Sequence, residues 1–179
     1  MGLYGARGQR KYLTAEAPRE TRTPCLLLAY TGCRISEALA LTTDRVDLEA
    51  GAVIFASLKK RRADVYRAVP VPRRVIDALD LAHDLRAPQK VGTGSRYRLW
   101  WGRTTSWRRV QEVMRAAGIT GPQANPKGLQ HGFGVQAVGK GIPLNMVQKW
   151  VGHAQLSTTA IYADAVGAEE HHIATNMWE

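Results

Sequence analysis

WVGHAQLSTTAIYAD, residues 150–164, carries the most specific structural signal in this chain. Gly152 and His153 form a corner, and Tyr162 follows nine residues later, across a Ser-Thr-Thr segment suited to capping a new helix. A histidine at a helix junction usually has a structural role, and a single tyrosine usually packs its ring. Their pairing at this spacing is more specific than either residue alone.

Two strings further upstream also place polar side chains at helix starts. TGCRISEAL, residues 31–39, puts Arg34 directly after a glycine corner, where the following helix would hold it rigidly. Taken alone, this string is better explained by a surface arginine beside Glu37. KGLQHGFG, residues 127–134, places Lys127 three residues before Gln130. The three strings together carry the functional interpretation.

The hydrophobic periodicity predicts an α+β domain that is mainly helical and has a small antiparallel sheet. Leu27, Leu28, Ile35, Leu39 and Leu41 predict two short helices that are broken at Thr31 and Gly32. The other helical patterns cover residues 73–87, 107–117, 129–140, 143–152 and 155–165. VDLEAGAVIFASL, from residue 46, and RAVPVP, from residue 67, predict antiparallel strands around a basic loop. Residues 88–106, which carry Trp100 and Trp101, predict a long connection.

The length and the charge indicate one domain that binds an anionic partner. The chain has 179 residues, with 25 Lys and Arg against 15 Asp and Glu, a formal charge of +10. A sequence pI of about 10.1 is typical of phosphate-binding proteins, although a solvated basic face gives the same charge. Residues 1–11 read as a flexible arm or linker remnant, and residues 12–179 as the domain itself.

The cysteines and the apolar runs indicate the compartment. Cys25 and Cys33 are eight apart on what reads as one helix, which favours buried thiols over a disulfide. No apolar run approaches the ~20 residues that span a bilayer, and the N-terminus lacks the apolar segment of a signal peptide. The expectation is a cytoplasmic protein without a membrane partner.

The three strings resemble the catalytic domain of the tyrosine recombinases, the phage-integrase family, from about Thr23 to Trp178. The resemblance implies that family's fold and its reaction, site-specific DNA recombination and integration. In that reaction a tyrosine attacks a DNA phosphodiester, forms a 3′-phosphotyrosyl link and releases a 5′-hydroxyl. Matched by motif, Tyr162 is the nucleophile and Arg34 the first catalytic arginine. Lys127 fills the position usually held by His or Lys, and His153 is the histidine of the Gly-His pair.

The resemblance also implies a lysine in the hairpin turn that protonates the leaving oxygen. Lys59 matches this position best, and Lys60 is the rival. These residue types suit phosphoryl transfer, since a guanidinium can bind two phosphate oxygens and stabilise their developing charge. A phenol with a pKa near 10 needs such a positive field to act as a nucleophile. No cofactor or metal is expected, because side chains supply the positive charge.

The chain departs from the family pattern at Gln130, where the second catalytic arginine is expected. An amide carries no charge and cannot fork onto two phosphate oxygens. The loss should raise the barrier by on the order of 3 kcal/mol, about a hundredfold in rate. An engineered change and a natural loss of cleavage both explain Gln130. The N-terminal clamp domain of most recombinases is also missing, which makes a fragment one interpretation.

The expected partner is double-stranded DNA. Residues 167–178 read as a final helix that could mediate self-association, as a tetramer on DNA by resemblance. The alternative to an active recombinase is a catalytically inactive DNA-binding relic or accessory protein on the same fold. A metal-dependent nuclease is a remote third reading, because no carboxylate-rich cluster accompanies the histidines, and the adjacent His171 and His172 do not face each other on a helix.

Overall fold

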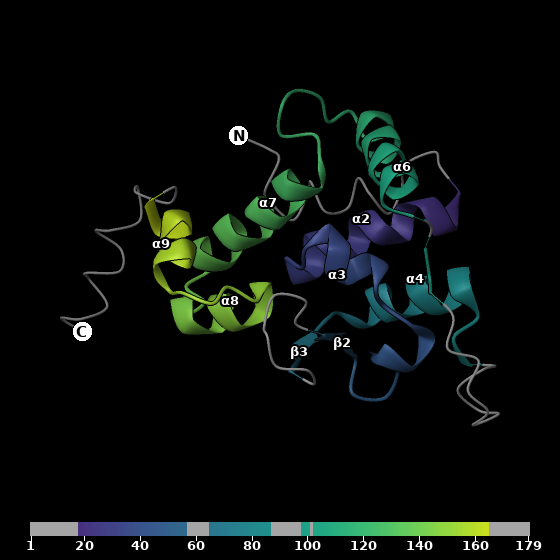
Figure 1. The fold of residues 1–179 in the computed structure, drawn as a ribbon, viewed down its shortest axis with the longest axis horizontal. Helices are drawn as coiled ribbons and strands as arrows, with labels where there is room; N and C mark the ends of the chain where they lie inside the picture. The colour runs from purple at the N-terminus through teal and green to yellow at the C-terminus, as the bar shows by residue number, and fades with distance from the viewer. Residues whose placement is uncertain (1–17, 57–64, 87–97, 101, 165–179) are drawn as a thin grey trace.

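The protein, described here by a computed structural model, is mainly helical with a small antiparallel sheet, as expected from the sequence (Figure 1). The structure describes residues 18–56, 65–86, 98–100 and 102–164. The helices are α2 (Arg19–Thr31), α3 (Ile35–Leu39), the 3-10 turn η1 (Thr43–Arg45), α4 (Arg73–His83), α6 (Arg103–Ala116), α7 (Pro126–Gly139), α8 (Leu144–Val151) and α9 (Ser157–Asp164). The strands are β1 (Val46–Asp47), β2 (Ala52–Ala56) and β3 (Tyr66–Pro70). The arm expected at residues 1–11 lies outside the described residues.

Helix α2 is the centre of the core. Its segment 25–30 is buried, and α4, α6 and α7 all pack against it. The helix ends at Gly32, which adopts a left-handed conformation with φ 62°. A Cβ at Gly32 would also overlap the ring of Phe133 and lie 2.8 Å from Val151 Cγ1. Both constraints require glycine here, so the predicted corner forms and brings Arg34 to the end of α8, where it contacts the Gly152 carbonyl.

The three strands pair in the order β1-β2-β3, all antiparallel, as the sequence predicts. Figure 1 shows the sheet beside α3 and α4. Val53 and Phe55 alternate toward the core, and Val69 joins them from β3. Phe55 is paired with Arg67, so an arginine on β3 stands at the rim of the core. The basic turn with Lys59 and Lys60 lies outside the described residues.

Several helix boundaries differ from the expected ones. Helix α4 ends at His83 rather than at residue 87, because Asp84 turns into the left-handed region with φ 47°. Helix α6 begins at Arg103, inside the expected connection 88–106, since the extended Gly102 serves as its N-cap. Helix α7 begins at Pro126 rather than at residue 129, because the Asn125 side chain caps it by accepting the Gly128 N–H.

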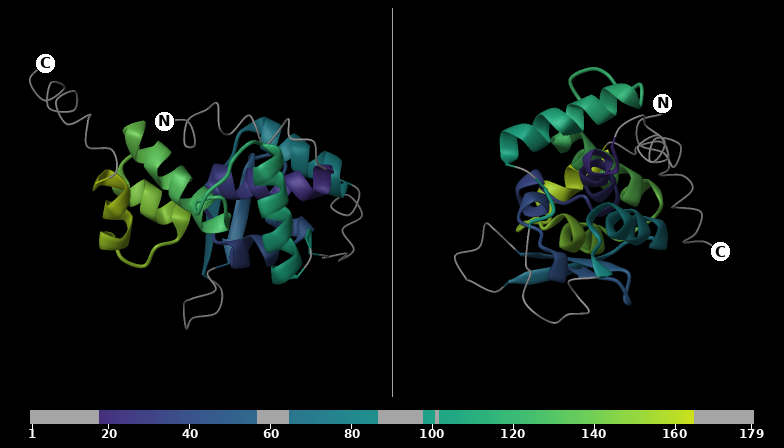
Figure 2. Two further views of the ribbon diagram at one scale, coloured as in Figure 1. Left: turned by 90° about the horizontal axis from the view of Figure 1, so that it is seen from above. Right: turned by 90° about the vertical axis from the view of Figure 1, so that its right-hand side faces the viewer.

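Helices α7, α8 and α9 gather at the end of the molecule away from α4 and α6 (Figure 2). They enclose a second, smaller apolar cluster made by Ala137, Val147, Val151 and Tyr162. Gly152 ends α8 with φ 70°, and the chain then turns into α9. The Gly-His corner and the tyrosine therefore belong to one packing unit.

The cysteines are both free and buried, as expected. Cys33 nevertheless lies beyond the end of α2, so the expectation that the two share a helix is wrong, because Gly32 ends the helix between them. Burial raises the pKa of the Cys33 thiol to about 12. Within the described ranges, no helix is long and apolar enough to cross a membrane. No group of three His, Cys, Asp or Glu side chains there is arranged to hold a metal ion.

Candidate active site

Arg34 lies at the start of α3, with its guanidinium directed toward the end of α8. Its backbone N–H donates to Glu37 Oε2 at 2.8 Å, which closes the first turn of the helix. Its Nη1 donates to the carbonyl oxygen of Gly152 at 3.2 Å. The Arg34 side chain keeps 26% of its surface exposed. The corner after α2 therefore holds Arg34 firmly and still leaves its charge open to a ligand.

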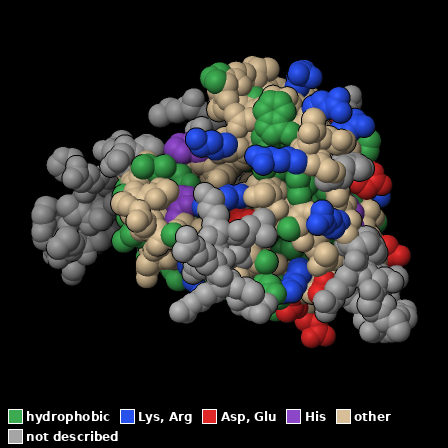
Figure 3. All heavy atoms as spheres, viewed as in Figure 1, with side chains coloured by type: hydrophobic (Ala, Val, Ile, Leu, Met, Phe, Trp, Pro, Cys, Tyr) green, Lys and Arg blue, Asp and Glu red, His purple; other side chains and the backbone are tan. Residues whose placement is uncertain are grey.

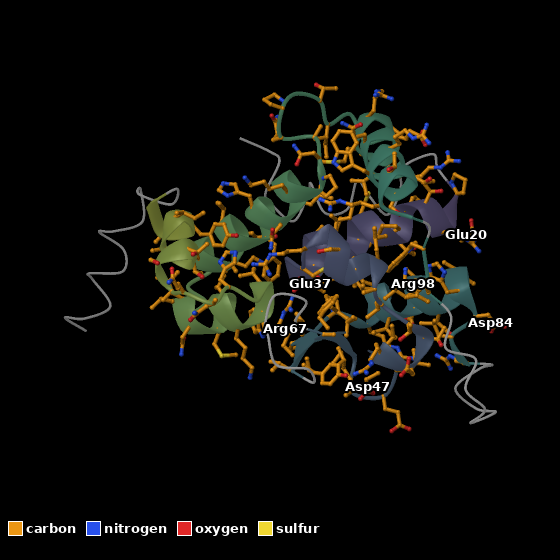
Figure 4. All side chains as sticks on the ribbon, in the orientation of Figure 1. Glu20, Glu37, Asp47, Arg67, Asp84 and Arg98 are labelled. Atoms are coloured by element: carbon orange, nitrogen blue, oxygen red, sulfur yellow. The ribbon has the colours of Figure 1, made fainter. Side chains whose placement is uncertain are left out.

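Glu37 is buried, and Arg67 of β3 neutralises it. Arg67 Nη1 lies 2.9 Å from Glu37 Oε1, and Nη2 lies 2.8 Å from Oε2. Arg67 Nε donates to the carbonyl oxygen of Trp150 at 2.9 Å. In Figure 4 the labelled Glu37 and Arg67 lie where α3, α8 and β3 meet. Arg67 was not among the residues predicted from the sequence, where the available signal was a charged residue between apolar residues on a short strand.

Tyr162 is packed against α7 and the Gly-His corner. It is 3% exposed, and a Cβ on Gly134 would overlap its ring. The rings of His131 and His153 lie 5.5 Å and 5.9 Å from the Tyr162 ring, the first edge-on and the second stacked. Burial raises the pKa of the Tyr162 phenol, and the positive charge of Arg34 acts in the opposite direction. Arg34 is thus close enough to Tyr162 to act on it electrostatically.

His153 is held in place from both sides of the corner. Its Nδ1 lies 3.1 Å from Thr159 Oγ1, a hydroxyl of the Ser-Thr-Thr segment. Its backbone carbonyl accepts a hydrogen bond from Gln148 Nε2 at 3.2 Å. These contacts fix the imidazole plane over the Tyr162 ring. The nine-residue spacing in the sequence therefore corresponds to a direct ring contact.

Helix α7 presents a strip of residues three or four positions apart. Lys127, Gln130, His131 and Gly134 share one face, and Tyr162 lies against its Gly134 end. Gln130 Nε2 is buried and has no hydrogen-bond partner among the described residues. Lys127 is exposed in the first turn. His131 packs the edge of its ring on Tyr162.

A cavity of about 520 Å³ opens beside these groups. Arg34, Arg67, Lys149 and His153 contribute to its wall, and none of its described lining residues is Asp or Glu. Figure 3 shows histidine side chains near Lys and Arg side chains on the face viewed in Figure 1. Such a wall attracts anions and suits a phosphate. The cavity and the neighbouring phenol together could bind a phosphodiester beside a nucleophile.

The site residues predicted from the sequence fall into three groups. Arg34, His153 and Tyr162 come together around the Gly-His corner. Gln130 and Lys127 lie on the α7 strip, whose other end touches Tyr162. Lys59 lies outside the described residues, so its position relative to the others stays a prediction. The catalytic roles of all six also stay predictions.

Comparison with known proteins gives consistent matches. The model of the phage integrase family matches residues 11–168. Tyrosine recombinase XerD of Mycobacterium leprae is 34% identical over 161 residues, which cover 83% of this chain and 49% of that protein. Tyrosine recombinase XerA of Pyrococcus furiosus is 30% identical over 149 residues, 76% of this chain and 47% of that protein. The chain thus spans about half the length of the curated relatives it matches.

Solved structures share the fold. The crystal structure of XerA recombinase superposes with a TM-score of 0.76 at 24% identity, covering 99% of this chain and 65% of that one. XerH recombinase, bound to its difH substrate in a post-cleavage complex, superposes with a TM-score of 0.71 at 22% identity, covering 96% of this chain and 50% of that one. At these identities the superpositions show the arrangement of helices and strands.

Proposed function

The chain belongs to the phage integrase family, and on this basis we propose that it serves in site-specific recombination of duplex DNA. Tyr162 is the proposed nucleophile, and the strand is cut and rejoined through a 3′-phosphotyrosyl intermediate. Arg34, Lys127 and His153 bind the reacting phosphate, and Lys59 donates the proton to the leaving oxygen. Gln130 weakens the reaction relative to an arginine at the same position.

One observation carries this proposal: the Tyr162 ring, the His153 ring and the Arg34 guanidinium converge beside one cationic cavity. These residues come from separate parts of the chain, and only folding brings them together. A buried tyrosine that merely filled space would not need two histidines and an arginine around it. The cluster has the composition that phosphoryl transfer without a metal requires.

The proposed reaction forms one bond and breaks one. Tyr162 Oη attacks the phosphorus, gives its proton to solvent, and forms the O–P bond of the 3′-phosphotyrosyl link. The bond from phosphorus to the 5′ oxygen breaks, and that oxygen leaves as a hydroxyl after it gains a proton from Lys59. Arg34 stabilises the charge on the nonbridging oxygens. Attack by another strand's 5′-hydroxyl reverses the sequence and releases Tyr162.

The environment of Tyr162 keeps the phenol protonated in the free protein. Its pKa is raised by burial, while the charge of Arg34 lowers it. At neutral pH the hydroxyl therefore loses its proton only as the bond to phosphorus forms.

Gln130 favours a second candidate, a DNA-binding protein without cleavage activity. The amide nitrogen is buried and has no hydrogen-bond partner among the described residues, so in this conformation it presents neither a donor nor a charge to a phosphate. An arginine at this position would stabilise the transition state by on the order of 3 kcal/mol more. Both candidates bind duplex DNA and differ in strand cleavage alone.

A nicked suicide duplex separates the two candidates. Cleavage next to the nick releases a short fragment and traps the covalent protein–DNA adduct, which migrates slowly on a denaturing gel. We expect a weak adduct with the native chain and at least about a hundredfold faster formation with Gln130→Arg. Tyr162→Phe is the matched control, since it removes only the hydroxyl. If the native chain binds the duplex and forms no adduct while Gln130→Arg forms one, the second candidate holds for the native chain and position 130 is limiting.

Binding itself is tested by its salt dependence. Phosphate contacts should make the affinity for duplex DNA fall steeply as salt rises. Self-association through residues 167–178 is a further part of the proposal, with a tetramer on DNA as the expected assembly. Sedimentation with and without duplex, for the full chain and for a chain ending at residue 166, would show whether that segment mediates assembly.

A further inference from the structure

Glu37 has two possible arginine partners, and it binds them unequally. Arg67 contacts both carboxylate oxygens, at 2.9 Å and 2.8 Å. The Arg34 guanidinium reaches only one of them, at 3.5 Å, although Arg34 lies just three residues away on the same turn. The Glu37 side chain is 3% exposed and the Arg67 side chain 10%, whereas Arg34 is 26% exposed. Arg67 therefore holds the carboxylate, and the more exposed Arg34 guanidinium stays accessible to a ligand.

The preference matters because Glu37 could otherwise neutralise Arg34. A buried carboxylate without a partner is strongly unfavourable and draws in the nearest cation. A guanidinium that forks onto a carboxylate uses the same edge that would fork onto a phosphate. If Arg67 were absent, Arg34 would be the nearest described cation able to turn onto Glu37. That movement would also break its bond to the Gly152 carbonyl.

We propose that Arg67 is a positioning residue, which occupies the Glu37 carboxylate and thereby keeps Arg34 available to a DNA phosphate. The inference rests on the proposed function for the identity of the anion, and on the local geometry for everything else. Arg67 acts through Glu37 and Arg34, and its role is to set the charge that Arg34 presents to the cavity.

Arg67 also ties the hairpin strand to the Gly-His corner. Its Nε donates to Trp150 O at 2.9 Å. A Cβ on Gly152 would lie 2.8 Å from Arg67 Cζ, so glycine is required there for the guanidinium to fit as well as for the positive φ. One side chain thus connects β3 with α3 and with the end of α8. A lysine has one ammonium and cannot make all three contacts.

The test measures how much Arg34 contributes to duplex binding in different backgrounds. The affinity of the full chain for a fluorescent duplex is measured by anisotropy. Three backgrounds are compared: the native chain, Arg67→Gln, and the double variant Glu37→Gln/Arg67→Gln. Each is measured with and without Arg34→Gln. In the native background Arg34→Gln should weaken binding on the order of tenfold. In the Arg67→Gln background, Arg34→Gln should weaken duplex binding by less than about threefold, because Glu37 already holds Arg34.

The double background separates this role from simple packing. When Glu37→Gln accompanies Arg67→Gln, the Glu37 carboxylate can no longer capture Arg34. Arg34→Gln should then again weaken duplex binding about tenfold. If Arg67 only supports the fold, the effect of Arg34→Gln on duplex affinity is as small in the Glu37→Gln/Arg67→Gln background as in Arg67→Gln alone. That result overturns the proposal. Arg73→Gln, which removes an exposed cation paired with Asp77, is the control and should leave the cost unchanged. If Arg67→Gln does not fold, Arg67→Lys takes its place and should give an intermediate cost.

A crystal structure of the Arg67→Gln chain gives a result that does not depend on DNA. We expect the Arg34 guanidinium to contact both oxygens of Glu37 and to leave Gly152 O. An Arg34 that keeps its native position refutes the role given to Arg67. If the native chain fails to bind duplex in a salt-dependent way, the proposed function fails, and this structure still decides the role of Arg67.

Discussion

Gly134→Ala is the substitution for which the structure gives the clearest expected effect. The added Cβ would lie 2.5 Å from Tyr162 Cζ and closer still to two other ring atoms. The ring must retreat by about 1 Å to restore ordinary contact, and a misplacement of that size can cost about a hundredfold in rate. Alanine gains about 1 kcal/mol of helix propensity, which offsets part of the ~1–3 kcal/mol cost of overpacking. The fold should therefore survive while the nucleophile is displaced.

Adduct formation on the nicked suicide duplex measures this effect, in the Gln130→Arg background where the signal is larger. Gly134→Ala should slow adduct formation about a hundredfold and lower the free energy of unfolding by no more than about 2 kcal/mol. Gly102→Ala is the matched control, since a Cβ there meets nothing within 4 Å and the residue has an ordinary φ of −64°. It should leave the rate unchanged.

Adduct formation by Gly134→Ala at the parent rate, with the chain still folded, would refute this expectation. That result would mean that the Tyr162 ring is free to leave the surface of α7 before it reacts. A large loss of stability without a selective loss of rate would also contradict it, because the contact would then serve the packing of α9 alone.

Three further outcomes are expected. Burial lowers the pKa of His83, so its neutral form is favoured in the folded state, and the free energy of unfolding should decline as pH falls below about 6.5, an effect that His83→Gln should remove in acid melts. Cys25 and Cys33 are fully buried with raised thiol pKa values, and iodoacetamide should label them only after denaturant unfolds the chain. Thr159→Val removes the hydroxyl that contacts His153 Nδ1 and should slow adduct formation about tenfold with little change in duplex affinity.

The local patterns predicted much of the fold because they report forces that act within short segments. The glycine corner at Gly32, the hairpin from residue 46, and the helices that flank the Gly-His pair all follow from periodicity and turn chemistry. The helix ends were less predictable, since Asp84 and Gly102 act through single backbone conformations that composition does not reveal.

The sequence alone determined the class of fold, the family, and the spacing of His153 and Tyr162, because motifs of nearby residues encode these features. Tertiary structure decided which distant side chains meet. The contact of Tyr162 with Gly134 depends on how α9 packs on α7, and the choice of Glu37 between Arg34 and Arg67 depends on how α3 and β3 meet. Such contacts join residues far apart in the chain, and the energies that select them come from burial and charge, which exist only once the core has formed.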